Sequence, residues 1–339
     1  MPRILKVDPW NPEEEFIEEG AALLRSGRLV AFPTETVYGL GANGLDGRAV
    51  ARIFSAKGRP SDNPLILQFS APREVEGTAR LSPRARRLME LFWPGPLTLV
   101  LPAREGIPPE VTAGLSTVAV RMPSHPVALA LLSRTGFPVA APSANSSGRP
   151  SPTDAASVAS DLGDRVDLIL DGGSSSVGVE STVLDLTGPE MVLLRPGGCP
   201  VEEIEIQTGE KVLLAGGSAN RSPGTRYRHY APLVPLLLAG DEGVRERVIA
   251  QRGRAAWVGM SSPDSFFGRD IVPGKYTIRF SSPENYARGL FSALRTLEAS
   301  GARIIVAEWP EEKGIGRALR DRLYRASREE SPGQTARFP

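Results

Sequence analysis

The 339-residue sequence predicts an α/β protein of two domains, and two patterns support this prediction. Up to residue 207, short apolar runs alternate with segments whose apolar residues recur at helical spacing. Several of these runs follow one another with no helix between them, which favours a twisted mixed sheet with helices on its faces over an all-parallel sheet. Beyond residue 232, apolar runs alternate with amphipathic segments, which favours a smaller, Rossmann-like parallel α/β domain.

The elements of the first domain, residues 1–207, follow from local patterns. Asp46 is a suitable cap for a helix with Val50, Ile53 and Phe54 on one face, and Gly58 is a suitable end. Helices are predicted at 12–26, 46–57, 82–92, 126–135 and 153–162. Strands are predicted at 29–32, 65–69, 97–101, 118–121, 139–141, 167–170, 182–185 and 192–194.

Residues 208–232 are rich in Gly, Ser, Arg and Pro, and this composition predicts a linker. The linker contains RYRHY, whose aromatic and basic side chains could form a lid over a nucleotide, with Tyr230 in contact with it. The alternative is a tether whose aromatic residues pack on a domain edge. Residues 233–339 then form the smaller domain, with strands expected at 233–238, 255–260 and 303–307.

Composition excludes several classes of protein. The 41% of apolar residues suffices for two cores, but no apolar run approaches the ~20 residues that span a bilayer. The N-terminal segment turns acidic early, unlike a signal peptide, so we expect a cytoplasmic protein. A single cysteine, Cys199, excludes an internal disulfide, and the two histidines, His125 and His229, are too few for a His-based zinc site.

The segment SAKGRPSDNPL carries two cations directly after a predicted helix. Lys57 and Arg59 lie one residue apart on a turn stiffened by Gly58 and Pro60, so an anion there would relieve their repulsion. Phosphate oxygens suit the planar guanidinium of Arg59 and the point charge of Lys57. The alternative is a solvated helix end, where the helix dipole favours cations.

Two further polar segments adjoin predicted strands. APSANSSG supplies Ser143, Asn145 and free backbone N–H groups suited to phosphate or ribose, although an isolated segment of this kind is more often an ordinary turn. In PTETVYGLG, strand-like alternation would put Thr34, Thr36 and Tyr38 on one face. The glycines of this segment match G-x-G-x-x-G, but the polar run PTETVY separates them from the preceding strand, so a dinucleotide site is not favoured.

These segments together resemble a known family. PTETVYGLG and the K-x-R-P…N-P-L block are followed in order by STVAVRMP, the S-x-N segment, ESTV, LLRPG, SPGTRYRHYAP and GIGRALRDRLYRAS. The chain resembles the threonylcarbamoyl-adenylate synthases, with a YrdC-type catalytic domain, over nearly its whole length. The last two motifs are similar to the linker and extension of the long, two-domain form.

The resemblance implies that L-threonine, bicarbonate and ATP give threonylcarbamoyl-AMP and pyrophosphate. It further implies Mg²⁺ bound through the nucleotide, and downstream threonylcarbamoyltransferase proteins that modify adenosine 37 of tRNA. Lys57 and Arg59 would be catalytic. The residues expected on the ATP side are Lys57, Arg59, Asn63, Thr117, Ser143, Asn145, Ser151, Arg195 and Tyr230. Those expected on the threonine side are Thr36, Gln68, Arg121 and Ser181.

Gln68 departs from the family pattern, because the family usually has histidine at this position of P-L-I-x-H. Glutamine keeps a hydrogen-bond donor and an acceptor but carries no charge or transferable proton. If residue 68 only orients threonine, the exchange of histidine for glutamine costs little activity. If the family's histidine titrates during the reaction, the pH profile of this chain should differ from that of the family.

A different class of function is a double-stranded-RNA-binding module without catalysis. The net charge of +1 argues against a chain-wide nucleic-acid surface, but Arg84, Arg86 and Arg87 cluster on one predicted helix. Direct contact with tRNA or other RNA therefore remains an expectation for this helix, and salt-sensitive RNA binding without pyrophosphate release would favour this alternative.

Overall fold

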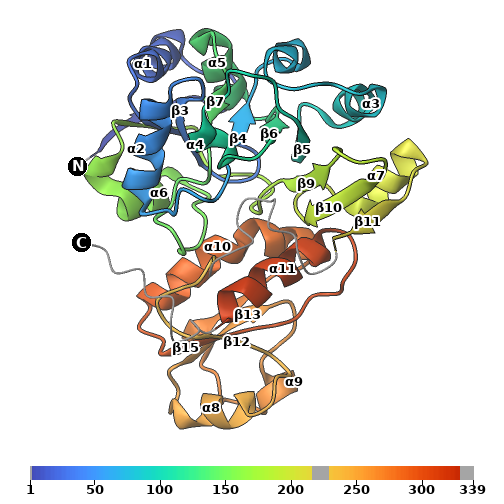
Figure 1. Ribbon diagram of the computed structural model, residues 1–339. Helices are drawn as coiled ribbons and strands as arrows, with labels where there is room; N and C mark the ends of the chain where they lie inside the picture. The colour runs from blue at the N-terminus through green and yellow to red at the C-terminus, as the bar shows by residue number, and fades with distance from the viewer. Residues whose placement is uncertain (1, 216–228, 329–339) are drawn as a thin grey trace.

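The computed structural model describes residues 2–215 and 229–328, which form two sheets flanked by helices (Figure 1). The larger sheet has eleven strands in the order β1-β8-β2-β3-β7-β4-β6-β5-β9-β10-β11, with both parallel and antiparallel neighbours. The smaller sheet has four strands in the order β12-β15-β13-β14, all parallel. The predicted fold class is therefore confirmed. We call residues 2–215 the large-sheet domain and residues 233–328 the small-sheet domain.

The elements of the large-sheet domain follow the predicted alternation. Its strands are β1 (Arg3–Lys6), β2 (Val30–Phe32), β3 (Gly39–Asn43), β4 (Ile66–Gln68), β5 (Leu97–Pro102), β6 (Thr117–Arg121), β7 (Val139–Ala140), β8 (Leu168–Asp171), β9 (Thr182–Asp185), β10 (Met191–Arg195) and β11 (Val212–Leu214). Its helices of seven or more residues are α1 (Glu14–Arg25), α2 (Gly47–Lys57), α3 (Pro83–Phe92), α5 (Pro126–Thr135), α6 (Ala155–Leu162) and α7 (Val201–Thr208), and α4 (Pro109–Thr112) is a single turn.

Strand pleating divides the apolar residues between the two faces of the large sheet. On β2, Val30 and Phe32 pack with α1 and α5, whereas Ala31 belongs to the larger cluster that includes α2, α3 and α6. On the face of α1 and α5, a separate small cluster contains Ile66, Val100, Ala119, Val183 and Leu194 and no residue of either helix. This part of the face forms the floor of the site described below.

Three strands of the large sheet were not predicted, and neither was β14 (Thr277–Arg279) of the small sheet. β3 contains Gly39, Gly41 and Asn43, residues that favour turns, and it becomes a strand because it pairs with β2 and β7. β1 pairs with β8, far away in sequence. β11 lies inside the range expected to be a linker and pairs parallel with β10. Residues 216–228, which hold most of the predicted lid, fall outside the described residues, and His229 and Tyr230 are its described end.

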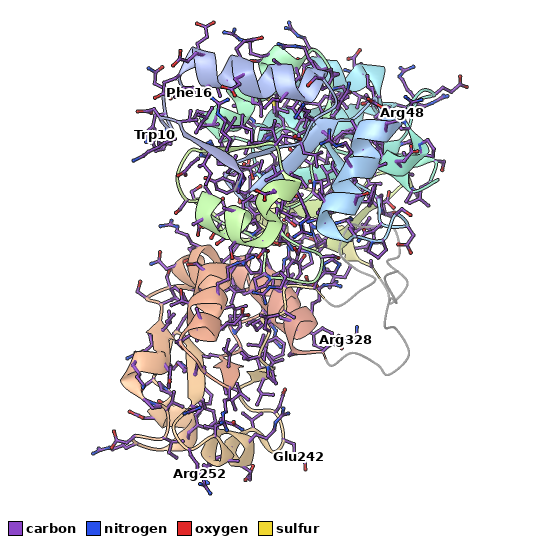
Figure 2. All side chains as sticks on the ribbon, turned by 90° about the vertical axis from the view of Figure 1, so that its left-hand side faces the viewer. Trp10, Phe16, Arg48, Glu242, Arg252 and Arg328 are labelled. Atoms are coloured by element: carbon purple, nitrogen blue, oxygen red, sulfur yellow. The ribbon has the colours of Figure 1, made fainter. Side chains whose placement is uncertain are left out.

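The small-sheet domain is built on β12 (Leu236–Leu238), β13 (Ala255–Gly259), β14 (Thr277–Arg279) and β15 (Ile304–Ala307). Its helices are α8 (Val244–Ala250), α9 (Asp264–Phe267), α10 (Pro283–Ala299) and α11 (Ile315–Ser327). Helices α10 and α11 lie between the small sheet and the large-sheet domain, with α8 and α9 on the far side (Figure 1). Glu242 and Arg252 accordingly lie at the end farthest from the large-sheet domain (Figure 2). Among the described residues, no helix has the length and apolar character needed to cross a membrane.

The basic cluster on α3 is partly neutralised. Arg84 forms an ion pair with Glu210 at 2.8 Å, and Arg86 forms one with Glu76 at 2.6 Å. Two of the three arginines that suggested a basic RNA surface therefore have acidic partners.

Candidate active site

Ten of the thirteen predicted site residues line one pocket. They come from β4, β6 and β10, from the loops before β3 and β9 and after α2 and β7, and from the segment that leads into the small-sheet domain. Ile66 also lines the pocket and belongs to the small apolar cluster on that face, so the pocket lies over the sheet as well as at strand ends. The ten are Thr36, Arg59, Gln68, Arg121, Ser143, Asn145, Ser151, Ser181, Arg195 and Tyr230.

Lys57 lies behind the pocket and supports its wall. It is the last residue of α2, which Asp46 caps at one end and Gly58, with φ +60°, at the other. The buried ammonium donates to the backbone oxygens of Ser143 and Asn145, the latter at 2.6 Å. Burial, and then the neighbouring Arg59, lower the pKa of Lys57 well below its usual value.

Arg59 lines the pocket directly. Its Nη2 donates to the backbone oxygens of Asn63 and Pro64 at 3.2 and 3.1 Å, which fixes the side chain across the turn. Burial lowers the pKa of the guanidinium to about 10, so Arg59 stays charged at neutral pH. Asn63 is buried in that turn and does not line the pocket. Thr117 begins β6, at the end opposite Arg121, and does not line it either.

The segment from Ser143 to Ser151, which we call the S-x-N loop, holds its own shape. The Ser143 hydroxyl donates to Asn145 Oδ1, and Asn145 Nδ2 donates to the backbone oxygens of Ser146 and Arg149, both at 2.9 Å. Gly148 permits the turn because its φ is +87°. The loop is therefore preorganised, with two serines and an asparagine among the pocket-lining groups.

Arg121 lines the pocket and makes three polar contacts of its own. Nη1 donates to the Thr36 hydroxyl at 3.0 Å, Nη2 pairs with Glu35 at 2.7 Å, and Nε donates to the Gly95 backbone oxygen at 3.2 Å. A guanidinium has five N–H groups, so two remain after these three contacts. Arg121 can therefore still bind a carboxylate, while Glu35 and Thr36 fix its orientation.

Ser181 and Gln68, which were also predicted to contact threonine, line the same pocket. The Ser181 hydroxyl lies 2.7 Å from that of Thr98 and accepts from Arg195 Nη2 at 3.2 Å. Gln68 Oε1 is buried at the pocket and accepts no hydrogen bond from the described part of the chain. A buried acceptor without a donor costs free energy until a ligand donor satisfies it, so Gln68 points to a ligand N–H or O–H.

One expectation for the PTETVYGLG segment was wrong. Thr36 lines the pocket, but the Tyr38 side chain is buried in the core and donates to the Gly173 backbone oxygen at 2.6 Å. The alternation failed because residues 35–37 form a bend rather than a strand. The Thr34 hydroxyl donates to the Val37 backbone oxygen at 2.6 Å and stabilises this bend, which brings Val37 to the pocket instead.

The small-sheet domain supports two of the residues that line the pocket, Glu180 and Tyr230. Arg322 of α11 is fully buried, and its Nε pairs with Glu180 at 2.6 Å. Glu180 also accepts from the Ser151 hydroxyl. The guanidinium of Arg322 lies 5.2 Å from the ring centre of Tyr230, which stacks on Phe291. Burial opposes ionisation of Glu180, but Arg322 and Arg195 outweigh it and lower its pKa.

The sequence reasoning assigned no role to four residues at the site: Glu180 and His229, which line the pocket, and Glu35 and Arg322, which pair with lining residues. Each of the four lies inside a motif that the sequence analysis recognised, so the motif marked its position but did not indicate what the residue does. His229 lines the pocket, and its Nε2 is buried with no partner among the described residues. Burial, and then the charges of Arg59 and Arg325, lower the pKa of His229 to about 3, so the imidazole is neutral at pH 7.

The chain matches two family models in sequence order. Residues 22–197 match the model described as Telomere recombination, and residues 199–328 match the one described as Threonylcarbamoyl-AMP synthase, C-terminal domain. A putative threonylcarbamoyl-AMP synthase of Mycobacterium tuberculosis is 42% identical over 200 residues, which are 58% of this chain and 92% of that relative. Some relatives therefore match only part of this chain while being covered nearly completely themselves.

Longer relatives match both domains. The threonylcarbamoyl-AMP synthases of Pyrococcus abyssi and Bacillus subtilis are 47% and 45% identical, covering 93% and 94% of this chain and 95% of each relative. The crystal structure of P. abyssi Sua5 complexed with L-threonine aligns with a TM-score of 0.86 at 44% identity, covering 96% of this chain and 97% of that one. With both domains matched and the predicted residues gathered in one pocket, the chain belongs to the threonylcarbamoyl-AMP synthase family.

Proposed function

We propose that this synthase binds L-threonine beside Arg121 and ATP beside Arg59, Arg195 and the S-x-N loop. The observation that carries the proposal is the meeting of two chemically different sets of side chains in one pocket. The similar P. abyssi Sua5 crystallised with L-threonine supports the amino-acid half.

On the threonine side, the two unused N–H groups of Arg121 bind the carboxylate as a fork. Gln68 Oε1 accepts from the amine, or from the N–H of the carbamate derived from it. The Thr36 and Ser181 hydroxyls lie where the threonine side chain can form hydrogen bonds.

In the reaction, the threonine amine and bicarbonate form a carbamate with loss of water. A carbamate oxygen then attacks the α-phosphorus of ATP, and pyrophosphate leaves. Such a transfer requires alignment of the reactants and neutralisation of growing negative charge more than a protein nucleophile. Arg59 and Arg195 provide the cations, and the S-x-N loop provides hydroxyl and amide groups for phosphate or ribose oxygens. Tyr230 and His229 at the wall help to exclude water from the acyl adenylate.

The donor set of the pocket fits magnesium carried by the nucleotide better than magnesium held by the protein. Glu180 is the acidic side chain among the lining residues, and it already forms an ion pair with Arg322 and accepts a hydrogen bond from Ser151. No group of three or more His, Cys, Asp or Glu side chains lies together in the residues that the structure describes. When bound to the phosphate oxygens, Mg²⁺ would neutralise part of their charge.

Pyrophosphate release tests the function directly. The purified chain is incubated with ATP, L-threonine and bicarbonate, and each is omitted in turn. We expect release to require all three, and threonylcarbamoyl-AMP to appear with the pyrophosphate. Release without threonine would contradict the proposed substrate. We propose that the product passes to tRNA threonylcarbamoyltransferase proteins. The chain's membership of a synthase family removes the reason for an RNA-binding module without catalysis.

A further inference from the structure

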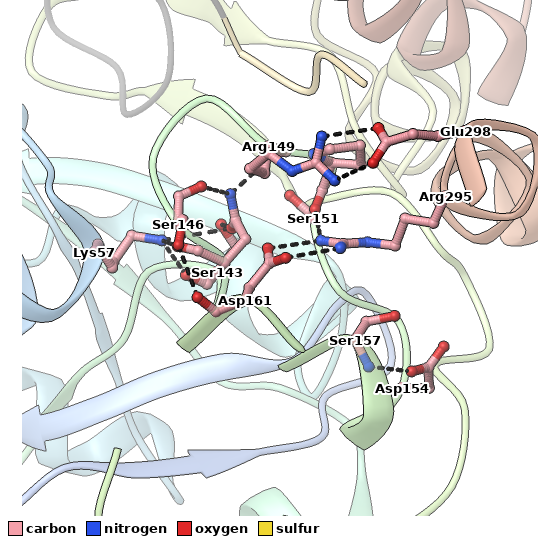
Figure 3. A network of polar contacts seen from close by, with 12 residues as sticks. Lys57, Ser143, Ser146, Arg149, Ser151, Asp154, Ser157, Asp161, Arg295 and Glu298 are labelled. Atoms are coloured by element: carbon pink, nitrogen blue, oxygen red, sulfur yellow. Dashed lines mark hydrogen bonds and ion pairs between the residues drawn. The ribbon is translucent and has the colours of Figure 1, made fainter. Parts of the chain in front are cut away.

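Helix α10 of the small-sheet domain holds the S-x-N loop through two arginine–carboxylate pairs (Figure 3). Glu298 receives two hydrogen bonds from the loop residue Arg149, at 2.8 and 2.7 Å. Arg295 donates two to Asp161 of α6, both at 2.8 Å, and a third to the backbone oxygen of Pro150. Three contacts from one helix face therefore end on the loop or on the helix that follows it.

Both pairs have geometry that fixes orientation. Each is bidentate, so the guanidinium and the carboxylate are locked in a common plane. The side chains of Arg149 and Glu298 are 20% and 15% exposed, and those of Arg295 and Asp161 are 14% and 6% exposed. Exposed single ion pairs contribute little, whereas these pairs are shielded and geometrically constrained.

The contacts continue directly into the pocket groups. The backbone oxygen of Arg149 accepts from Asn145 Nδ2 at 2.9 Å, and Pro150 immediately precedes Ser151. Glu298 also accepts from the backbone N–H of Leu233 at 2.6 Å, and the N–H of Ala231 donates to the Gly148 oxygen at 2.8 Å. The end of the linker is thus bonded to the same structure.

The loop is held from two directions. Lys57 of the large-sheet domain binds the backbone oxygens at its start, and α10 binds residues 149 and 150 near its end (Figure 3). General docking of two domains would not require polar contacts on this loop. The pair between Arg317 of α11 and Glu202 of α7, at 3.4 Å, also joins the domains without touching it.

We infer that Glu298 and Arg295 are positioning residues for ATP, acting through the S-x-N loop. This inference rests on the ATP role proposed for that loop. Loss of either pair loosens Asn145 and Ser151 without altering the threonine side of the pocket. The small-sheet domain thereby sets the affinity of the synthase for its nucleotide.

The test compares variants of the full chain by steady-state pyrophosphate release. In Glu298→Gln, and separately in Arg295→Met, we expect the KM for ATP to rise about tenfold, the size of one lost interaction of this kind. The KM for threonine should stay within about twofold of that of the unaltered protein. The double variant Arg149→Glu with Glu298→Arg exchanges the two charges and should recover most of the ATP affinity. Each of these substitutions alone places two like charges together, so it should raise the KM for ATP more than Glu298→Gln does.

Two further variants separate the possible outcomes. Arg317→Met removes an interdomain pair that does not touch the S-x-N loop, and it should leave both KM values unchanged. If Arg317→Met raised the KM for ATP as much as Glu298→Gln does, the effect would come from general docking of the domains, and the inference would be overturned. Asn145→Ala tests the loop itself. If Asn145→Ala raises the KM for ATP and Glu298→Gln and Arg295→Met do not, the positioning role fails alone. If Asn145→Ala leaves the KM for ATP unchanged, the ATP role of the loop fails, and the inference fails with it.

Circular dichroism and thermal unfolding identify variants that do not fold. Arg149→Lys is then measured in place of such a variant. It keeps the positive charge but loses the bidentate contact with Glu298, so it should raise the KM for ATP.

Discussion

The two domains differ most in the polar residues that they bury. The large-sheet domain buries Thr36, Lys57, Arg121, Asn145 and Arg195 around its pocket, at a considerable cost in desolvation. Among residues 233–328, the buried charged side chains are Glu308 and Arg322. Glu308 accepts from the backbone N–H groups of its own domain, whereas Arg322 pairs with Glu180 at the pocket of the other domain.

This difference indicates a division of labour. A domain that keeps a ligand site of its own buries polar groups and tolerates their cost, because the ligand satisfies them. In its described part, the small-sheet domain instead directs its buried guanidinium, and the Arg295 and Glu298 pairs, toward its neighbour. These three contacts thus support the pocket of the large-sheet domain.

The largest effect is expected from removing Arg322. In Arg322→Ala, the Glu180 carboxylate stays buried without its cation, so the free energy of unfolding should fall by about 3–5 kcal/mol. Denaturant-induced unfolding measures this change. The double variant Glu180→Gln with Arg322→Met, which buries no charge at this place, should recover much of the loss. An Arg322→Ala protein as stable as the unaltered one would remove the contrast between the domains.

Removing Arg59 should affect catalysis rather than folding. In the proposed function Arg59 neutralises charge on the leaving pyrophosphate, so kcat should fall by roughly 10²–10³-fold in Arg59→Ala. Arg48→Ala, an exposed arginine on the surface of the same domain, is the matched control and should leave kcat unchanged (Figure 2). Equal turnover in both variants would rule out the phosphate role of Arg59.

Selection for threonine over serine should be moderate. The two amino acids differ by one methyl group, which is worth about 1–3 kcal/mol in an apolar environment, so kcat/KM should differ by about 10–200-fold. Val37, Leu65, Ile66 and Ala141 are among the apolar residues of the pocket lining. Competition between the two amino acids measures the ratio. A preference for serine would show that this side of the pocket does not contact the methyl group.

The last effect vanishes at neutral pH and is visible only below it. The pKa of His229 falls from about 6.5 in the unfolded chain to about 3 in the folded protein. Between these values the unfolded chain binds the proton and the folded protein does not, so stability falls as the pH is lowered through this window. Unfolding midpoints of His229→Gln between pH 7 and 4 should therefore decline less than those of the unaltered chain, with no difference in slope above pH 7. Parallel declines would mean that His229 is protonated in the folded protein.

The sequence was most informative where the chemistry is local. The helix that ends at Lys57 could be predicted because its cap, its apolar spacing and Gly58 lie within 13 residues of one another. Most strands of the large sheet were predictable for the same reason, since a run of apolar residues is visible without knowledge of its neighbours. Strands β1, β3 and β11 were not, because pairing with distant strands rather than their composition makes them strands.

By itself, the sequence determined the α/β class, the family and ten of the residues that line the pocket, because residue type and order carry that information. Only the tertiary structure decided that Tyr38 faces the core, that Lys57 supports the S-x-N loop from behind, and that Glu35 orients Arg121. It also decided that Arg322, 142 residues away from Glu180 in sequence, pairs with that residue of the pocket lining. Such contacts join residues that are far apart in sequence, and the packing free energy that brings them together is spread over many side chains, so no local pattern reveals which of them will meet.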